Sequence, residues 1–187
     1  MSFLREYIKN PKEIGSITAD SSRCVDIMLD AVDFRRANVL IEYGSGTGAV
    51  TREILQRMNT HARLLSFEKN PGLFRATLAG LNSRQLCAFN RDIFTCSGVF
   101  QDLGLDGHFA DCIISTLPCS TIDCHKLIEY HVLPYLQADA VFIQYMHMLS
   151  VIKGFRLLPI LNRYFGLVKR KAVWRNLPPA FVYICRL

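Results

Sequence analysis

From residue 39 onward, short apolar runs alternate with stretches whose apolar residues recur at helical spacing. Near-continuous apolar runs are typical of strands buried on both faces, and the i, i+3, i+4 spacing is typical of amphipathic helices. The pattern predicts five strands separated by helices, with the strands at 39–43, 62–68, 85–90, 109–115 and 140–146, and the helices at 49–58, 71–80 and 124–133. Such an alternation indicates a mainly parallel sheet with helices on both faces.

The two ends of the chain depart from this alternation. Apolar residues at helical spacing predict helices at 2–9 and 21–34, and Asn10-Pro11 ends the first of them. After an apolar and basic segment at 147–163, two strand-like pieces at 167–174 and 180–187 close the chain. We expect these two pieces to form an antiparallel hairpin on the edge of the sheet.

The length of 187 residues fits one domain with a sizeable core. Half of the residues are hydrophobic and 20% are charged, which excludes global disorder. No apolar stretch approaches the ~18–20 uncharged residues that a membrane span needs. We therefore expect a protein that is not integral to a membrane but is able to lie on one.

Positive charge is concentrated in the last quarter of the chain. Residues 1–139 hold 14 Lys or Arg and 16 Asp or Glu, whereas residues 140–187 hold eight Lys or Arg and no acidic residue. These basic side chains are interleaved with aliphatic and aromatic ones. Such a segment suits a phosphate-bearing partner, either nucleic acid or an anionic membrane surface, although a simple solvated face is the alternative.

The seven cysteines are scattered without a CxxC pair, and the N-terminus carries charges where a secretory signal would be apolar. Both observations indicate a reduced, cytoplasmic protein whose thiols pack as small apolar groups. Cys119, Cys124 and His125 lack the tight four-ligand spacing of a zinc site. We expect no metal.

Alternate glycines follow the first strand directly and precede a helix, at Gly44, Gly46 and Gly48. Glycine lets the backbone turn tightly and approach a ligand closely, and a helix N-terminus offers free N–H groups. This loop predicts a nucleotide-containing ligand. Because Gly44, Gly46 and Ala49 also satisfy the GxGxxA pattern, a dinucleotide is one candidate.

Carboxylates at successive strand ends favour S-adenosylmethionine instead. Glu42 lies just before the glycines, where it suits the ammonium end of a methionine moiety and would repel a pyrophosphate. Glu68 ends the second strand, where it can accept hydrogen bonds from ribose hydroxyls. Asp92 follows the third strand and can accept from the adenine amino group.

These residues carry a family resemblance. The segment VLIEYGSGTGAVTREIL resembles motif I of class I S-adenosylmethionine-dependent methyltransferases. More narrowly, FLREYIKNPKEIGSITADSSR, STLP at 115–118, FIQYMHM and NLPPAFVY resemble the bacterial phospholipid N-methyltransferase family. The resemblance implies a Rossmann-like α/β fold with a seven-stranded, mainly parallel sheet in the order 3-2-1-4-5-7-6. It also implies one methyltransferase domain over 1–187, with a helical extension at 1–36 and the core at 37–187.

The same resemblance implies an activity and a site. It implies N-methylation of an amino headgroup such as that of phosphatidylethanolamine, without metal, by a cytoplasmic protein bound peripherally to the inner face of a membrane. The cofactor is S-adenosylmethionine, which leaves as S-adenosylhomocysteine. The expected cofactor-binding residues lie in the glycine loop and at strand ends: Glu42, Gly44, Ser45, Gly46, Gly48, Glu68, Lys69, Asp92, Ile93, Ser115 and Leu117.

The acceptor side is expected after the fifth strand. Tyr145 and His147 are the candidates to accept a proton from the amine or to orient it. Tyr145, Arg175 and Asn176 are the candidates to bind the substrate. The helix at 2–9 and the segment 147–171 are the expected contacts with an anionic membrane.

Three other functions fit parts of the sequence. Ribosomal RNA adenine dimethyltransferases share the glycine motif, but Thr116-Leu117-Pro118-Cys119 lacks the amide or acid and the stacking ring that those enzymes place after the fourth strand. A small-molecule methyltransferase is a second alternative. A non-catalytic binding protein on a methyltransferase fold is the third.

Overall fold

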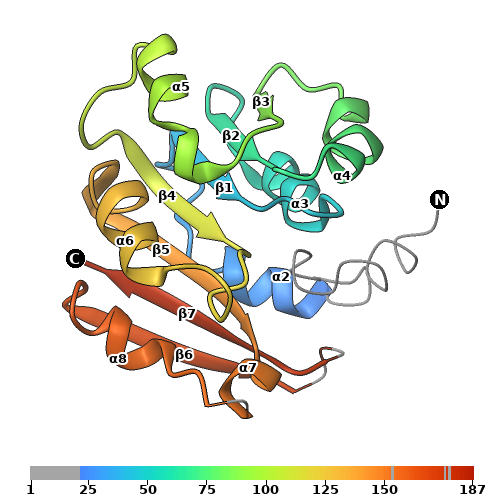
Figure 1. Ribbon diagram of the computed structural model, residues 1–187. Coiled ribbons are helices and arrows are strands. Elements are labelled where there is room, and N and C mark those ends of the chain that lie inside the picture. Colours follow the sequence, from blue (N-terminus) through green and yellow to red (C-terminus); the bar gives the residue numbers. More distant parts are fainter. Residues whose placement is uncertain (1–21, 153, 175, 177) are drawn as a thin grey trace.

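A seven-stranded sheet runs through the centre of the computed structural model, which describes residues 22–152, 154–174, 176 and 178–187 (Figure 1). The strand order is β3-β2-β1-β4-β5-β7-β6, so the order implied by the resemblance is confirmed. Only β7 is antiparallel to its two neighbours, β5 and β6. The strands are β1 (Val39–Tyr43), β2 (Arg63–Phe67), β3 (Leu86–Phe89), β4 (Ala110–Ser115), β5 (Leu136–His147), β6 (Leu167–Val173) and β7 (Ala180–Arg186).

Short helices connect the strands. They are α2 (Ser22–Leu29), α3 (Ala49–Arg57), α4 (Pro71–Ala76), α5 (Ser97–Asp102), α6 (Cys124–His131), α7 (Met148–Ile152) and α8 (Leu157–Leu161), with 3-10 turns η1 (Leu78–Gly80) and η2 (Ile93–Thr95). The helix predicted at 71–80 is therefore divided at Thr77, and the segment predicted only as apolar and basic at 147–163 contains α7 and α8. Helix α5 was not predicted.

Two hydrophobic cores cover the two faces of the sheet, because successive side chains of a strand point to opposite sides. On one face, Tyr43 and Phe67 pack with residues of α5, α6 and α8. On the other face, Leu40 and Leu64 pack with residues of α2 and α3. In Figure 1 these two sets of helices lie on opposite sides of the sheet. The prediction of a sheet covered on both faces is confirmed.

The C-terminal hairpin forms the edge of the sheet as predicted. Val173 pairs with Ala180, which in turn pairs with His147, so the turn of the hairpin and the end of β5 lie at the same edge. The outer strand β6 is largely exposed, with Lys169 and Lys171 among its exposed side chains. The hairpin therefore adds a positively charged border beside the carboxyl ends of the parallel strands.

The seven cysteines are all free, and six of them are buried, which confirms their predicted packing. Helix α2 occupies part of the predicted helix at 21–34. The predicted helix at 2–9 lies outside the described residues. The division into an extension at 1–36 and a core at 37–187 stays a prediction.

Candidate functional site

The loop between β1 and α3, residues 44–48, is called the glycine loop here, and its glycines all have positive φ angles. Gly44 has a φ of +81° and Gly48 a φ of +71°, a conformation that residues with a Cβ rarely adopt. A Cβ on Gly48 would lie 2.5 Å from Thr77 Cγ2, and one on Gly44 would lie 3.0 Å from Leu117 Cδ2. Gly48 is favoured by its φ and by the close approach of Thr77, whereas at Gly44 the positive φ is the main reason for glycine.

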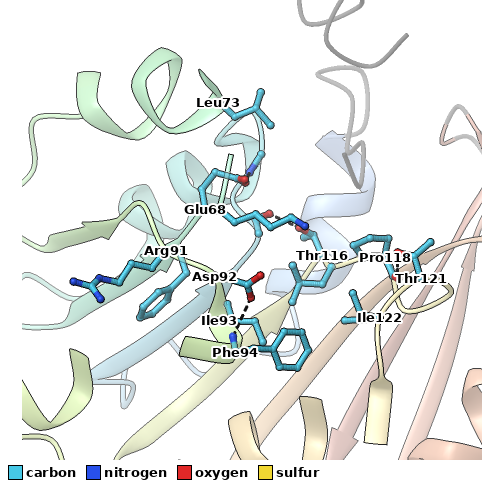
Figure 2. Close-up of a pocket in the computed structure, with 15 residues that line it drawn as sticks. Glu68, Leu73, Arg91, Asp92, Ile93, Phe94, Thr116, Pro118, Thr121 and Ile122 are labelled. Carbon is cyan, nitrogen blue, oxygen red and sulfur yellow. Dashed lines mark hydrogen bonds between the residues drawn. The ribbon is translucent and has the colours of Figure 1, made fainter. Parts of the chain in front are cut away.

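A cavity of about 330 Å³ opens beside this loop at the carboxyl edge of the sheet. Figure 2 shows Asp92, Ile93 and Phe94 on one side of it and Thr116, Pro118, Thr121 and Ile122 on the other. Most of the lining is apolar, with a few polar groups, which is the usual character of a small-molecule site. Its lining residues are Gly44, Gly46, Phe67, Glu68, Lys69, Leu73, Arg91, Asp92, Ile93, Phe94, Thr116, Leu117, Pro118, Thr121 and Ile122.

Glu68 links the end of β2 to the glycine loop. Its Oε2 accepts a hydrogen bond of 2.8 Å from the Gly46 backbone N–H, and its Oε1 accepts one of 2.8 Å from the Asn70 N–H. The side chain is 7% exposed, and burial raises the pKa of its carboxyl group. Each carboxylate oxygen keeps a second lone pair, so Glu68 can hold the loop and still accept from a ligand hydroxyl.

Glu42, the second-last residue of β1, is fully buried. Thr51 Oγ1 and Ser66 Oγ donate to its Oε2 at 2.7 and 2.6 Å. Its Oε1 has no hydrogen-bond partner among the described residues. Burial raises the pKa of Glu42 to about 7, against an ordinary value of 4.5. A cationic or N–H-bearing ligand group at Oε1 would favour the ionised form.

Asp92 caps the turn that follows β3. Its Oδ1 accepts from the Phe94 backbone N–H at 3.0 Å, and this bond places Ile93 and Phe94 along the cavity wall. The Phe94 ring meets the His131 ring edge-on, with centroids 5.1 Å apart. Asp92 itself is exposed and keeps acceptor capacity toward the cavity. Arg91 also lines the cavity, but Figure 2 shows its side chain extending away from the other labelled groups.

The segment 116–122, called the strand-four loop here, closes the other side of the cavity. Thr116 Oγ1 donates to the Gly44 carbonyl oxygen, and the Thr116 N–H donates to the Tyr43 carbonyl at 3.0 Å. Leu117 contacts the glycine loop through its side chain. The Leu117 N–H lies 3.4 Å from its acceptor Ser115 Oγ. The two loops are therefore interlocked across the mouth of the cavity.

A second polar group lies at the same edge, at the end of β5. Tyr145 OH is hydrogen-bonded to His147 Nδ1 at 3.1 Å, and Asn176 Nδ2 donates to the same hydroxyl at 3.1 Å. Asn176 Nδ2 also donates to the Pro178 carbonyl at 2.6 Å. Burial lowers the pKa of His147, which keeps its imidazole neutral near pH 7. We call Tyr145, His147 and Asn176 the acceptor-side cluster.

The predicted site residues fall into three groups. Tyr145, His147 and Asn176 are brought together, and Arg175 lies outside the described residues. Glu42, Ser45, Gly48 and Ser115 belong to the same strand ends and loops without being lining residues of the cavity. Seven predicted cofactor residues do line the cavity: Gly44, Gly46, Glu68, Lys69, Asp92, Ile93 and Leu117.

Sequence reasoning missed several functional candidates. Phe94 directly follows the predicted residues Asp92 and Ile93, so this candidate segment needed only one more residue to include it. Thr121 and Ile122 gave no signal, because a loop places them beside the cavity only after the chain has folded. Gln144 had one signal, an amide within the apolar run AVFIQYM.

Four buried side-chain atoms in the described residues have no hydrogen-bond partner, and all four lie at this carboxyl edge. They are Glu42 Oε1, Ser45 Oγ, Gln144 Oε1 and Asn176 Oδ1. Leaving such a group unpaired costs about 1–3 kcal/mol, so unpaired groups are uncommon in folded proteins. None of the four residues lines the cavity, so these atoms form a buried polar layer behind its wall. An apolar cavity with carboxylates at its rim fits S-adenosylmethionine, which joins an adenosine to a cationic amino acid end.

Two further features concern membranes and metals. Within the described residues, no helix has the length and apolar character needed to cross a membrane. Over the same residues, no three His, Cys, Asp or Glu side chains are grouped as ligands for a metal ion.

Comparisons with known proteins place the chain among methyltransferases. No family model matches it. A curated relative, the ornithine lipid N-methyltransferase of Singulisphaera acidiphila, is 25% identical over 191 residues, covering 98% of this chain and 94% of the relative. This similarity supports the resemblance to lipid N-methyltransferases seen in the sequence.

Solved structures share the fold at low sequence identity. The precorrin-6y C5,15-methyltransferase of Geobacter metallireducens aligns with a TM-score of 0.69 and 15% identity, over 92% of this chain and 93% of that one. Human methyltransferase-like protein 13, solved with S-adenosylhomocysteine, aligns with a TM-score of 0.68 and 13% identity, over 91% and 83%. The fold, the glycine loop and the near-complete alignment with a lipid N-methyltransferase together show that this chain is a class I S-adenosylmethionine-dependent methyltransferase.

Proposed function

We propose that this methyltransferase methylates a primary amine in the headgroup of a membrane lipid. The observation that carries the proposal is the alignment with an ornithine lipid N-methyltransferase over 98% of the chain. Phosphatidylethanolamine and ornithine lipids both present such an amine, and either is a candidate acceptor. S-Adenosylmethionine supplies a methyl group on a sulfonium, which an amine lone pair can attack.

The cavity supports this proposal through the groups that would hold the cofactor. We assign the adenosine end to the wall formed by Asp92, Ile93 and Phe94, with Glu68 beside the ribose. We assign the amino acid end to the glycine loop, with the fully buried Glu42 behind that loop as the nearest further carboxyl group. Correct placement of two reactants is worth roughly 7–11 kcal/mol in such a transfer, so positioning is the main task of these residues.

The acceptor-side cluster is suited to the proton that the amine must lose. A primary alkyl amine is protonated near pH 7, because its pKa resembles that of lysine at about 10.4. Desolvation of the headgroup in the site would lower the pKa of the ammonium, and the neutral imidazole of His147 could then take up its proton through Tyr145 OH. Asn176 fixes the hydroxyl through its donated hydrogen bond, and its Oδ1 is buried without a hydrogen-bond partner among the described residues.

Exposed apolar side chains mark the face that would meet the membrane. Leu149 and Ile152 on α7 and Trp174 after β6 are 49%, 78% and 73% exposed. The Met148 N–H donates to the Pro179 carbonyl at 2.8 Å, which fixes the start of α7 against the hairpin turn. We call Leu149, Ile152 and Trp174 the membrane patch. It lies at the carboxyl edge of the sheet, next to the acceptor-side cluster.

The part of the chain that holds the membrane patch is rich in positive charge. Residues 140–187 contain eight Lys or Arg and no acidic residue, and Arg156, Lys169 and Lys171 are exposed. Each such side chain near an anionic surface contributes about 1 kcal/mol, so a few are enough for reversible and salt-sensitive attachment. We therefore propose peripheral binding to an anionic membrane, with the inner face of a cell membrane as its place.

Incubation with methyl-labelled S-adenosylmethionine tests the acceptor. Three acceptors are offered in separate reactions. Two are phosphatidylglycerol vesicles that also contain either phosphatidylethanolamine or an ornithine lipid, and the third is total RNA. We expect label in at least one lipid amine, with less label at high salt. Label in RNA and in neither lipid would reject the proposal and favour the nucleic-acid alternative.

Vesicle co-sedimentation of two matched variants tests the membrane patch. Trp174→Ala removes an exposed ring from the patch, whereas Tyr130→Ala removes one that is 61% exposed on α6. We expect the first variant to sediment less with anionic vesicles and the second to behave as the wild type. Equal sedimentation of the two variants would remove the patch from the proposal.

A further inference from the structure

Gln144 is a fully buried amide in the middle of the apolar strand β5. Its neighbours on the same strand face, Phe142 and Met146, belong to the hydrophobic core. A glutamine is costly at such a position unless its polar atoms are hydrogen-bonded. The contacts of this side chain therefore account for its presence.

The amide nitrogen of Gln144 makes two hydrogen bonds. Nε2 donates to the Leu117 carbonyl at 3.1 Å and to the Tyr145 carbonyl at 2.7 Å. Because a carbonyl oxygen only accepts, both bonds require the –NH2 group on this side, and the orientation of the amide is fixed. Oε1 then faces away and has no partner among the described residues.

The first of these bonds reaches the cofactor side of the site. Leu117 belongs to the strand-four loop and lines the cavity. Its Cδ2 lies 3.0 Å from the position of a Cβ on Gly44, so the side chain rests on the glycine loop where glycine leaves room for it. A change in the Leu117 backbone would therefore be transmitted to the glycine loop by direct contact.

The second bond reaches the acceptor side. The Tyr145 carbonyl belongs to the residue whose hydroxyl is bonded to both His147 and Asn176. One side chain thus joins the wall of the cofactor cavity to the start of the acceptor-side cluster. In a methyl transfer, the rate depends steeply on the distance and angle between the two reactants, and misplacement by about 1 Å can cost roughly a hundredfold.

We propose that Gln144 is a positioning residue that fixes the strand-four loop against the glycine loop and sets the separation between the cofactor and the acceptor. Its kinetic consequence rests on the proposed lipid amine function, but its structural consequence does not. Loss of the two donated bonds would remove the side-chain support of the Leu117 carbonyl and would loosen the strand-four loop.

Gln144→Met, which has a similar shape and no donor, tests this role against Phe142→Leu, a core change on the same strand face. Hydrogen exchange is measured on peptides covering 116–122, and affinity for S-adenosylhomocysteine is measured by calorimetry. We expect faster exchange in these peptides and an affinity about tenfold weaker for Gln144→Met only. With the lipid acceptor, we expect kcat to fall by about a hundredfold while the KM for the lipid changes little.

Gln144→Glu keeps the shape of the side chain but cannot donate to both carbonyl oxygens, so it serves as a second variant and should give the same pattern. Equal exchange at 116–122 in the Gln144 and Phe142 variants, compared at similar unfolding temperatures, would overturn the proposal. So would a loss of kcat no larger in the Gln144 variants than in Phe142→Leu. If the exchange and affinity changes occur while the wild type methylates no lipid, the proposed function fails and the positioning role stands.

Discussion

Removal of the Glu68 carboxylate should weaken cofactor binding without unfolding the protein. Both oxygens of Glu68 already accept backbone N–H groups at 2.8 Å, from Gly46 and from Asn70. The side chain also lines the cavity. Glu68→Ala therefore removes the support of the glycine loop and an acceptor for the ligand in one change.

The size of the effect follows from the charge of the acceptor. A hydrogen bond to a charged group is worth roughly 1.5–3 kcal/mol, and about 1.4 kcal/mol corresponds to a factor of ten in affinity. We expect the dissociation constant for S-adenosylmethionine to rise by about ten- to a hundredfold in Glu68→Ala. Glu68→Gln should show a smaller rise, because its amide oxygen still accepts while its –NH2 group cannot accept from the second N–H.

Calorimetric titration with S-adenosylmethionine measures this change, and thermal unfolding verifies that the variants remain folded. Glu129→Ala is the matched control, because Glu129 is an exposed carboxylate on α6 that accepts from Tyr164 and does not line the cavity. An unchanged dissociation constant in Glu68→Ala would refute the reasoning, since the carboxylate would then contribute nothing to the cofactor site.

Three further outcomes are expected. Gly48→Ala should lower the unfolding free energy by about 1–2 kcal/mol from its positive φ alone, and by more through the contact with Thr77, as urea denaturation would report. The pKa of the Glu42 carboxyl group is about 7 in the folded protein and 4.5 ordinarily, so between these pH values the folded state binds a proton that the unfolded state has lost. The free energy of unfolding should therefore fall as pH rises from 4.5 to 7. Urea denaturation of Glu42→Gln at several pH values should no longer show this dependence. Tyr145→Phe should reduce kcat while leaving cofactor affinity unchanged, and a parallel loss of affinity in titration would contradict its place on the acceptor side.

The centre of the sheet was predictable from the sequence because strands β1, β2, β4 and β5 are largely buried. The run Val39–Tyr43 is apolar except for Glu42, and the observed strand has the predicted bounds. β5 was predicted too short, because Gln137 and Asp139 interrupt its apolar pattern while its backbone already pairs with β4 at Leu136. Local pattern therefore located the strands, and pairing between strands decided how far one of them extends.

The parts that the sequence did not reveal depend on contacts between distant segments. The helix predicted over 71–80 is interrupted at Thr77, whose hydroxyl donates to the Gly46 carbonyl at 3.1 Å. That bond joins residues 31 positions apart, and no local pattern records it. Gln144 is a similar case, since its partner Leu117 is 27 positions away. The sequence pointed to lining residues that a glycine motif or a strand end marks, and it missed those that only contacts between distant segments bring to the cavity.

The charged outer strand β6 has a consequence for how the protein behaves at high concentration. A sheet that ends in an unpaired strand offers open N–H and C=O groups to any other extended chain, and lysine on such a strand hinders that association. Lys169 and Lys171 stand on this strand, and Arg170 lies over the Phe181 ring at 4.7 Å. Neutralising these lysines to weaken lipid binding would therefore also expose the strand to self-association. Loss of membrane attachment in such variants is informative only when light scattering shows that they remain monodisperse.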